Sequence, residues 1–318
     1  MNNHVIVICG PTASGKTSLG IEIAKRINGE IISADSMQLY KYMNVGTAKP
    51  TEEEKEGIPH HMLDICTPDE EYNVSRYKED ATKCIEDIIS RGKTPIIVGG
   101  TGLYIDTLVR GIEFNEIEND IEYRNQLEEM VKENGIDFLF EELTKVDPES
   151  AKQIDKNNVR RVIRALEIYK VTGRKKSDLD KESVKGSKYN FQVYGILWDR
   201  EILYNRINER VDIMLNTGLV EEVKELREKY NLSKTALQGI GYKEVIKYLD
   251  NEYSYEDMVN AIKQESRRYA KRQMTWFNHM DYVEWLDGND KEKMIETILK
   301  MEEAISSKWM YKRKRNRI

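Results

Sequence analysis

The sequence predicts an α/β fold in which a parallel sheet is flanked by helices and an all-helical domain is inserted into the chain. Three observations predict this fold. Short apolar runs alternate with helical patterns, a glycine-rich stretch follows the first run, and charged helix-forming sequence fills the middle of the chain. With 318 residues, of which 39% are hydrophobic, the chain is long enough to bury a substantial core.

The predicted strands are short and rich in β-branched residues. The run VIVIC at 5–9 stops at Gly10, as expected of a buried parallel strand that leads into a helix. Similar runs occupy 30–33 and 95–98, with helical patterns between and after them. A further strand, QVYGILW at 192–198, predicts that the sheet resumes late in the chain and is followed by helices to about residue 305.

Charged, helix-forming sequence separates these strands into two groups. We therefore predict a core formed by 1–112 and 192–305, with a helical insertion at 113–191. The last residues, 306–318, form a basic tail. A solvated terminus and a segment that contacts RNA are both compatible with this tail.

Composition excludes several classes of protein. A formal net charge of −6 argues against indiscriminate coating of nucleic acid, so any RNA contact requires local basic patches. Cys9, Cys66 and Cys84 form no CxxC pair, which favours a reducing compartment. The apolar run near the N-terminus is too short for a signal peptide or a membrane span. We expect a cytoplasmic protein without a membrane partner and, in the absence of a coiled-coil pattern, a monomer.

The glycine-rich stretch GPTASGKT matches the phosphate-binding pattern G-x-x-x-x-G-K-[ST] and lies between a predicted strand and a predicted helix. The fold prediction is therefore a P-loop NTPase-like sheet. The predicted diphosphate-binding residues of this loop are Gly10, Pro11, Thr12, Ala13, Ser14, Gly15, Lys16 and Thr17. Glycines let the backbone wrap around phosphate oxygens, the lysine adds a positive charge, and the Thr17 hydroxyl can reach Mg²⁺. The loop alone does not distinguish ATP from another diphosphate.

The carboxylate Asp35 follows the second predicted strand and can hold Mg²⁺, cap a helix or act as a base. The third strand ends in GGTGLY, without a carboxylate at its tip. From these residues, a small-molecule kinase and an RNA-stimulated NTPase both remain open alongside a transferase. Adjacent His60 and His61 lack a CxxC partner, so zinc is not expected.

A series of longer motifs resembles the tRNA dimethylallyltransferases in order and spacing. They are GPTASGKT, ADSMQLYKYMNVGTAKP at 34–50, PHHMLDI at 59–65, VGGTGLY at 98–104, RRVIRALE at 160–167, RINERVDIMLNTGLVEEV at 206–223, ALQGIGYKE at 236–244 and AKRQMTWF at 270–277. The resemblance covers nearly the whole chain. Three positions depart from the family's commoner pattern: Tyr42 and Asn44 replace Gly and Asp, and Asn278 replaces an Arg near the presumed RNA.

The resemblance implies that the loop holds the diphosphate of dimethylallyl diphosphate, with Mg²⁺ held partly by Thr17. It implies catalytic roles for Lys16, for Asp35 as the base that accepts a proton from an adenine N6 amine, and for Thr101 near the reacting groups. Thr101 is equally suited to cap a helix. Arg210, rather than Arg206, is expected to complete the diphosphate site, although either can be a surface charge.

The partner implied by the resemblance is a tRNA anticodon stem-loop, whose unpaired adenine is accessible at low cost. The predicted tRNA-binding residues are Asp35, Ser36, Met37, Gln38, Thr101, Tyr123, Arg160, Arg161, Arg164, Gln238, Gly239, Gly241, Tyr242, Lys243, Arg268, Lys271 and Arg272. Gln38 has the amide needed to read an adenine edge. Two basic stripes at helical spacing, 160–164 and 263–272 with Lys263 and Arg267, also suit solvated helix faces, and Trp276 and Phe277 suit a core.

Overall fold

The computed structural model describes residues 3–114, 117 and 119–315. The chain divides into two compact units, one formed by Met1–Val109 with Ser187–Ile318 and the other by Arg110–Gly186. The second unit overlaps the insertion predicted at 113–191. Within the described part of the chain, no helix is long and apolar enough to cross a membrane.

The first unit is built on a six-stranded sheet whose paired strands are all parallel. The strands, in chain order, are β1 (His4–Cys9), β2 (Gly29–Ser33), β3 (His60–His61), β4 (Thr94–Gly99), β5 (Asn190–Leu197) and β6 (Val283–Asp287). Their order across the sheet is β3-β2-β4-β1-β5-β6. The α/β class and the four predicted strands are confirmed.

Two edge strands were missed by the sequence analysis. β3 has only two residues, too few for a period to show. β6 pairs with β5 alone and has only Leu286 buried, so the region predicted as entirely helical contains a strand without an apolar run.

Both faces of the sheet are covered by helices. Alternate residues of β1 point to opposite faces: Val5 and Val7 pack in one apolar cluster, whereas Ile6 and Ile8 pack in another. Because both sets are fully buried, β1 is the continuous apolar run expected of a central parallel strand.

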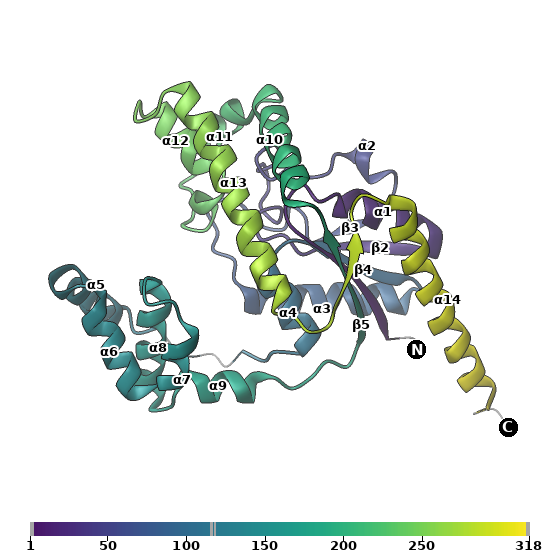
Figure 1. Cartoon of the computed structure of the whole chain (residues 1–318), viewed down its shortest axis with the longest axis horizontal. Helices are drawn as coiled ribbons and strands as arrows, with labels where there is room; N and C mark the ends of the chain where they lie inside the picture. Colours follow the sequence, from purple (N-terminus) through teal and green to yellow (C-terminus); the bar gives the residue numbers. More distant parts are fainter. Residues whose placement is uncertain (1–2, 115–116, 118, 316–318) are drawn as a thin grey trace. The chain divides into compact units, whose positions relative to one another are not determined.

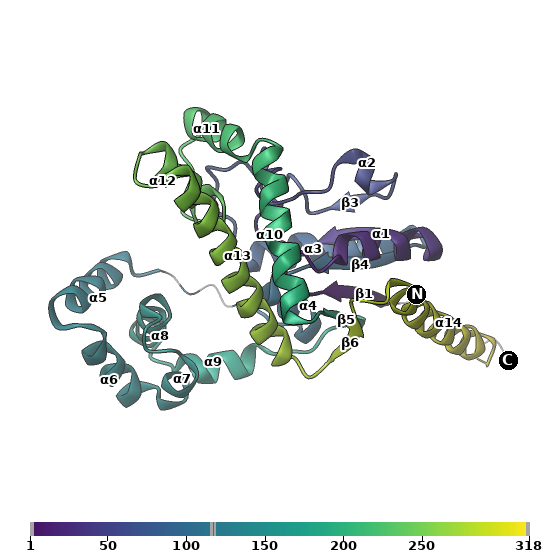
Figure 2. The ribbon, with the colours of Figure 1, turned by 45° about the horizontal axis from the view of Figure 1, so that its top comes forward.

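The helices of the first unit surround this sheet (Figure 1). They are α1 (Lys16–Ile27), α2 (Glu52–Lys55), α3 (Val74–Ser90), α4 (Gly102–Arg110), α10 (Arg200–Asn216), α11 (Leu219–Lys229), α12 (Tyr242–Leu249), α13 (Tyr255–Asn278) and α14 (Lys291–Arg315). Helices α10 and α13 lie side by side in both views (Figures 1 and 2). The backbone of the predicted basic tail continues α14 as far as Arg315, and residues 316–318 lie outside the described part.

The second unit is all-helical. Its helices are α5 (Ile121–Asn134), α6 (Ile136–Val146), α7 (Pro148–Gln153), α8 (Val159–Thr172) and α9 (Lys176–Ser183). Leu127, Leu143 and Val162 join α5, α6 and α8 in one apolar cluster. This unit therefore has a core of its own.

Candidate active site

Three loops meet at the carboxyl edge of the sheet. The phosphate loop follows β1, Asp35 follows β2, and the Gly99–Thr101 turn follows β4. Because β4 lies between β1 and β2, these three strand ends are neighbours. Ligands of open parallel sheets bind at this edge, so the strand order assembles the predicted motifs into one site.

The phosphate loop has the backbone conformation that its glycines permit. Gly15 has φ +89° and Ala13 has φ +61°, both in the left-handed region, and the Ser14 N–H donates to Pro11 O (3.3 Å). No side chain caps the start of α1. The first amides of this helix are therefore available to an anion, as the motif predicts.

Two side chains brace the loop from α10 and from the end of β5. Arg206 Nε donates to Ala13 O (2.8 Å), and Trp198 Nε1 donates to Ser14 O (2.9 Å). The Arg206 guanidinium also lies over the Trp198 ring, 4.4 Å from its centroid. Arg206 is thus occupied in holding the loop, whereas Arg210, one turn later, lines the pocket beside it.

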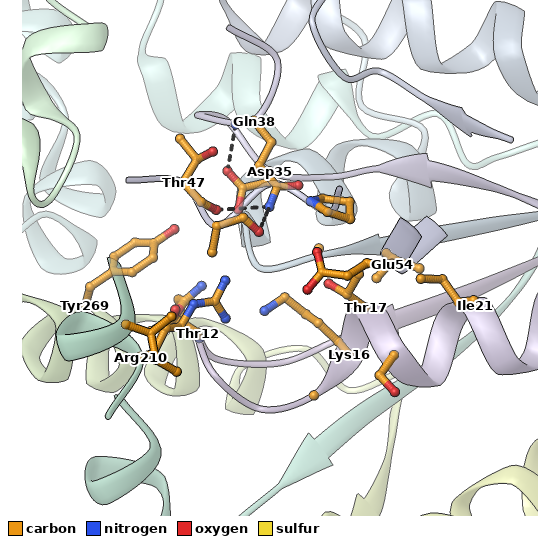
Figure 3. A pocket seen from close by; sticks show the side chains of 18 of the residues that line it. Thr12, Lys16, Thr17, Ile21, Asp35, Gln38, Thr47, Glu54, Arg210 and Tyr269 are labelled. Carbon is orange, nitrogen blue, oxygen red and sulfur yellow. Dashed lines mark hydrogen bonds between the residues drawn. The ribbon is translucent and has the colours of Figure 1, made fainter. Parts of the chain in front are cut away.

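This first pocket, of about 540 Å³, contains the loop residues Thr12, Gly15, Lys16 and Thr17 together with Arg210. Figure 3 shows the cationic ends of Lys16 and Arg210 close together in it. Burial chiefly, and Arg210 next, lower the pKa of Lys16 to about 8, while Asp35 opposes this shift. Burial also lowers the pKa of Arg210. Two cations whose charge is disfavoured make a site that an anion would stabilise.

Asp35 is held by one oxygen only. Its Oδ1 accepts from the Met37 and Gln38 backbone N–H groups (2.9 and 3.2 Å). No hydrogen bond joins its other oxygen to a described residue. Thr101 Oγ1 accepts from the Ser36 N–H (3.0 Å), so Thr101 fixes the turn that carries Asp35 and lines neither of the two pockets described here.

A second pocket, of about 390 Å³, adjoins the first. The residues that line both are Thr12, Asp35, Thr47, Arg210 and Tyr269. The others that line the second are Ser36, Met37, Gly46, Met214, Thr235, Gln238, Gly239, Ile240, Tyr242, Lys243, Ile262, Ser266 and Arg272. The structure thus brings together most of the predicted tRNA-binding residues of this unit around a partly apolar pocket. Gly241, at the start of α12 with φ +94°, does not line it.

Gln38 lines the first pocket rather than the second, and its amide is engaged. Its Nε2 donates to Thr47 O (3.1 Å), and its Oε1 accepts from Ser33 Oγ (3.3 Å). In this arrangement Gln38 holds the loop around Thr47, a role that differs from reading a base.

The same loop is held from outside by Glu222 of α11. Its carboxylate accepts from the backbone N–H groups of Asn44, Val45 and Gly46 (2.9, 2.7 and 3.2 Å) and from the Tyr242 hydroxyl (2.6 Å). A Cβ at Gly46 would lie 2.5 Å from the Tyr242 ring. Asn44 thus contributes its backbone here, while its side chain accepts from Lys49 (3.0 Å).

Tyr42 occupies a strained position. Its φ is +67°, a conformation that glycine adopts freely, and its side chain is exposed. The ring stacks on Tyr230, with centroids 5.7 Å apart. The backbone therefore explains why glycine suits this position.

The basic stripe on α13 separates into two sets. Lys263 and Arg267 face α10, where they contact Asp212 (2.6 Å) and Asn208 (2.6 Å). Arg268, Lys271 and Arg272 are exposed, although Arg268 pairs with Glu265 (2.7 Å). Asn278 is an exposed residue at the end of the helix, and Phe277 is fully buried as predicted.

In the second unit, Arg160 and Arg161 are exposed at the start of α8. Arg164 is engaged in an ion pair with Glu167 (2.5 Å), which is fully buried and also binds Arg124 (2.7 Å). Burial raises the pKa of Glu167, but these guanidinium groups outweigh burial and lower it. Arg164 therefore supports the helical core. Tyr123 packs against that core, with Lys170 5.7 Å from its ring centroid.

Tyr269, Gln273 and Glu222 are among the residues of the site that the sequence analysis missed. Tyr269 and Gln273 lie one turn apart on α13, and the helical spacing of four, three and four residues through Ile262, Ser266, Tyr269 and Gln273 was the available signal. Glu222 lies among several surface acids of α11. Nothing in its local pattern separates it from them.

The sheet and its phosphate loop define a P-loop-like α/β protein. The family model described as IPP transferase matches residues 38–280, and the chain belongs to this family. It is 53% identical over 301 residues to a tRNA dimethylallyltransferase of Acetivibrio thermocellus, covering 93% of this chain and 96% of that protein. A Bacillus mycoides tRNA dimethylallyltransferase is 47% identical, with 96% of each chain covered.

Solved structures agree with this assignment. The full-length tRNA isopentenylpyrophosphate transferase from Bacillus halodurans superposes with a TM-score of 0.73 at 41% identity, covering 98% of this chain and 100% of that one. A eukaryotic dimethylallyltransferase acting on tRNA gives a TM-score of 0.79 at 34% identity, covering 97% and 80%. The predicted family resemblance and the P-loop NTPase-like fold are confirmed.

Proposed function

We propose that this protein is a tRNA dimethylallyltransferase. It transfers the dimethylallyl group of dimethylallyl diphosphate to N6 of the adenine 3′ to the anticodon, in tRNAs that read codons beginning with U. The observation that carries the proposal is the junction of two pockets at Asp35: one contains a phosphate loop with two desolvated cations, and the other is partly apolar. Membership of the IPP transferase family supports it further.

The diphosphate binds in the first pocket. The amides at the start of α1, Lys16 and Arg210 receive it, and they also stabilise the charge that grows on the diphosphate as the allylic C–O bond breaks. Leaving-group stabilisation is the main requirement, because the N6 lone pair is delocalised and makes a poor nucleophile. Arg206 and Trp198 keep the loop in place during this step.

The adenine enters from the second pocket. Its N6 forms the new bond to the allylic carbon, and the proton released from N6 passes to the Asp35 oxygen that no described residue occupies. Thr101 positions Asp35 through the Ser36 amide. The apolar side chains Met37, Met214 and Ile262 shelter the allylic cation character from water.

The site is compatible with Mg²⁺ if the diphosphate supplies most of the ligands. In the described residues, no group of three His, Cys, Asp or Glu side chains can hold a metal ion alone. Thr17 lines the pocket and would hold Mg²⁺ together with diphosphate oxygens, a ligand set that this ion accepts. The ion would supply further neutralisation of the leaving group.

The test is transfer itself. The purified protein is incubated with Mg²⁺, dimethylallyl diphosphate and an unmodified tRNA whose anticodon loop has consecutive adenines, and the digested RNA is weighed by mass spectrometry. The expected result is a gain of one dimethylallyl group on a loop adenine, lost in Lys16→Ala. No gain with several such tRNAs, together with ATP consumption when small metabolites are added, would favour a kinase instead.

A further inference from the structure

Gln273 of α13 is a buried polar residue that connects two parts of the site. Its Oε1 accepts from the Thr12 backbone N–H (2.9 Å), and its Nε2 donates to Gly100 O (2.9 Å). The residue is 6% exposed. The oxygen and one N–H of the amide are therefore used within the protein, and the residue borders the first pocket.

The two groups that Gln273 joins belong to different halves of the site. Thr12 is in the phosphate loop and lines both pockets. Gly100 precedes Thr101, whose hydroxyl receives the Ser36 N–H of the Asp35 turn. The Gln273 amide thus lies between the diphosphate-binding loop and the turn that carries the carboxylate.

The approach is close enough to restrict the residues on both sides. A Cβ at Gly100 would lie 2.2 Å from Gln273 Nε2, so a side chain at position 100 would displace the Gln273 amide from this arrangement. Position 273 needs an acceptor and a donor at the end of one side chain of this length. Glutamate of the same shape lacks the donor, and methionine lacks the donor and has only a weak sulfur acceptor.

We infer that Gln273 is a positioning residue that sets the distance between the diphosphate loop and the Asp35 turn, so that the allylic carbon and the adenine N6 meet in line. The inference rests on the proposed transferase function. Because the Thr12 N–H is satisfied by Gln273, the loop residue at the junction is placed by α13 rather than by the diphosphate. A misplacement of about 1 Å costs on the order of 100-fold in rate.

The experiment compares Gln273→Met and Gln273→Glu with the same changes at Gln264, an exposed glutamine of the same helix. The measurements are kcat, KM for dimethylallyl diphosphate, Kd for inorganic diphosphate and Tm. We expect Gln273→Met to lower kcat about 10- to 100-fold while KM and Kd change less than about threefold. The Gln264 variants retain the kcat of the unmodified protein.

The pH dependence of kcat in Gln273→Glu distinguishes a positioning role from a purely structural one. Burial raises the pKa of a carboxyl at this position, so lowering the pH protonates it and restores a donor toward Gly100 O. The kcat of Gln273→Glu, relative to the unmodified protein, therefore rises as pH falls from about 8.5 to 6. The kcat of Gln273→Met relative to the unmodified protein does not change over this pH range.

A kcat within threefold of the unmodified protein in folded Gln273→Met would overturn the inference. If that variant does not fold, the inference is overturned instead when the kcat of Gln273→Glu, relative to the unmodified protein, does not rise at low pH. The unmodified protein is measured in the same assay. Absence of dimethylallyl transfer there would contradict the proposed function, whereas normal transfer with unaffected variants would contradict only the role of Gln273.

Discussion

Two carboxylates mark the ends of β2: Glu30 near its amino end, and Asp35 just beyond its carboxyl end. They differ in how many of their oxygens are hydrogen-bonded. At the amino end, Glu30 is 1% exposed and accepts from Arg91 (2.5 and 2.7 Å), Lys93 (2.7 Å) and His61 (2.7 Å). At the carboxyl end, Asp35 has one oxygen held by backbone amides and another that no described residue occupies. Saturation marks Glu30 as structural, whereas Asp35 lines both pockets and is the proton acceptor in the proposed reaction.

The cations around these carboxylates differ in the same way. Hydrogen bonds with Glu30 and Asp87 raise the pKa of Arg91, so its charge is stabilised by the folded protein. Burial lowers the pKa of Lys16 and of Arg210 at the opposite edge. At one edge of the sheet the charges are paired within the protein, and at the other two buried cations form a site that an anion would stabilise, as the proposed function requires.

The largest expected effect is at Asp35. Asp35→Asn keeps an oxygen that accepts from the Met37 and Gln38 amides but cannot accept the N6 proton. We expect kcat to fall about 10²- to 10⁴-fold, with Tm close to that of the unmodified protein. Enzyme kinetics with matched thermal unfolding checks this. A fall in Tm comparable with that of a core variant would show that Asp35 is structural.

Glu30→Gln is the converse change. It leaves Arg91 and Lys93 without a full counter-charge, and because both are partly exposed we expect a loss of roughly 2–3 kcal/mol in the free energy of unfolding. At a temperature where the variant is folded, kcat stays within about threefold of the unmodified value, since Glu30 and its cationic partners do not line the two pockets. A large loss of kcat without a loss of stability would break the comparison.

The ion pairs of Glu30 also determine how the free energy of unfolding responds to acid. Hydrogen bonds from Arg91 chiefly, opposed by burial and aided by Lys93 and His61, hold the pKa of Glu30 well below the ordinary value of 4.5. Its contribution is therefore complete above about pH 4.5 and is lost as pH falls through the depressed pKa. The difference in unfolding free energy between the unmodified protein and Glu30→Gln should shrink below pH 4.5 in chemical denaturation.

Glu222 tests whether the role of a carboxylate follows from its hydrogen bonds or from its distance to the pockets. It lies near the second pocket but accepts from three backbone amides and one hydroxyl. We expect Glu222→Gln to reduce the free energy of unfolding by about 1–3 kcal/mol because backbone donors lose an acceptor. KM for tRNA should rise, since the loop carrying Thr47 loosens. A variant whose free energy of unfolding and KM for tRNA both equal those of the unmodified protein would contradict this.

A smaller effect follows from the lowered pKa of Lys16. The free protein carries this charge below about pH 8 and loses it above, so diphosphate binding weakens as pH rises through that value. We expect KM for dimethylallyl diphosphate to rise several-fold from about pH 7 to 9. Lys16→Met should bind more weakly with a flat profile. A parallel rise in that variant would assign the titration to another group.

The smallest expected effect concerns strain at the carboxyl edge. Tyr42 has φ +67°, and Tyr42→Gly and Tyr42→Ala both remove its stack on Tyr230. Because only glycine relaxes this conformation, the glycine variant should be more stable than the alanine variant by about 0.5–1 kcal/mol. Equal stability, measured by chemical denaturation, would show that the backbone at 42 relaxes without glycine.

The sequence allowed prediction of those features that have a local signal. The four apolar strands, the phosphate loop and Asp35 each follow from a short pattern, and the strand order then brings them together. The family resemblance favoured Arg210 over Arg206 for the diphosphate site, but no pattern predicts the role of Arg206, since only the folded structure shows that it binds the Ala13 carbonyl. Gln273 and Glu222 act through backbone groups distant in the chain, which no local period records.

In the proposed reaction, diphosphate binding and proton acceptance belong to different residues at one edge of the sheet. The most direct test measures two quantities in Asp35→Asn: the single-turnover rate of dimethylallyl transfer with all substrates saturating, and the Kd for inorganic diphosphate. We expect a transfer rate reduced by at least about 100-fold and a Kd within about threefold of that of the unmodified protein. A transfer rate that survives the change would contradict it.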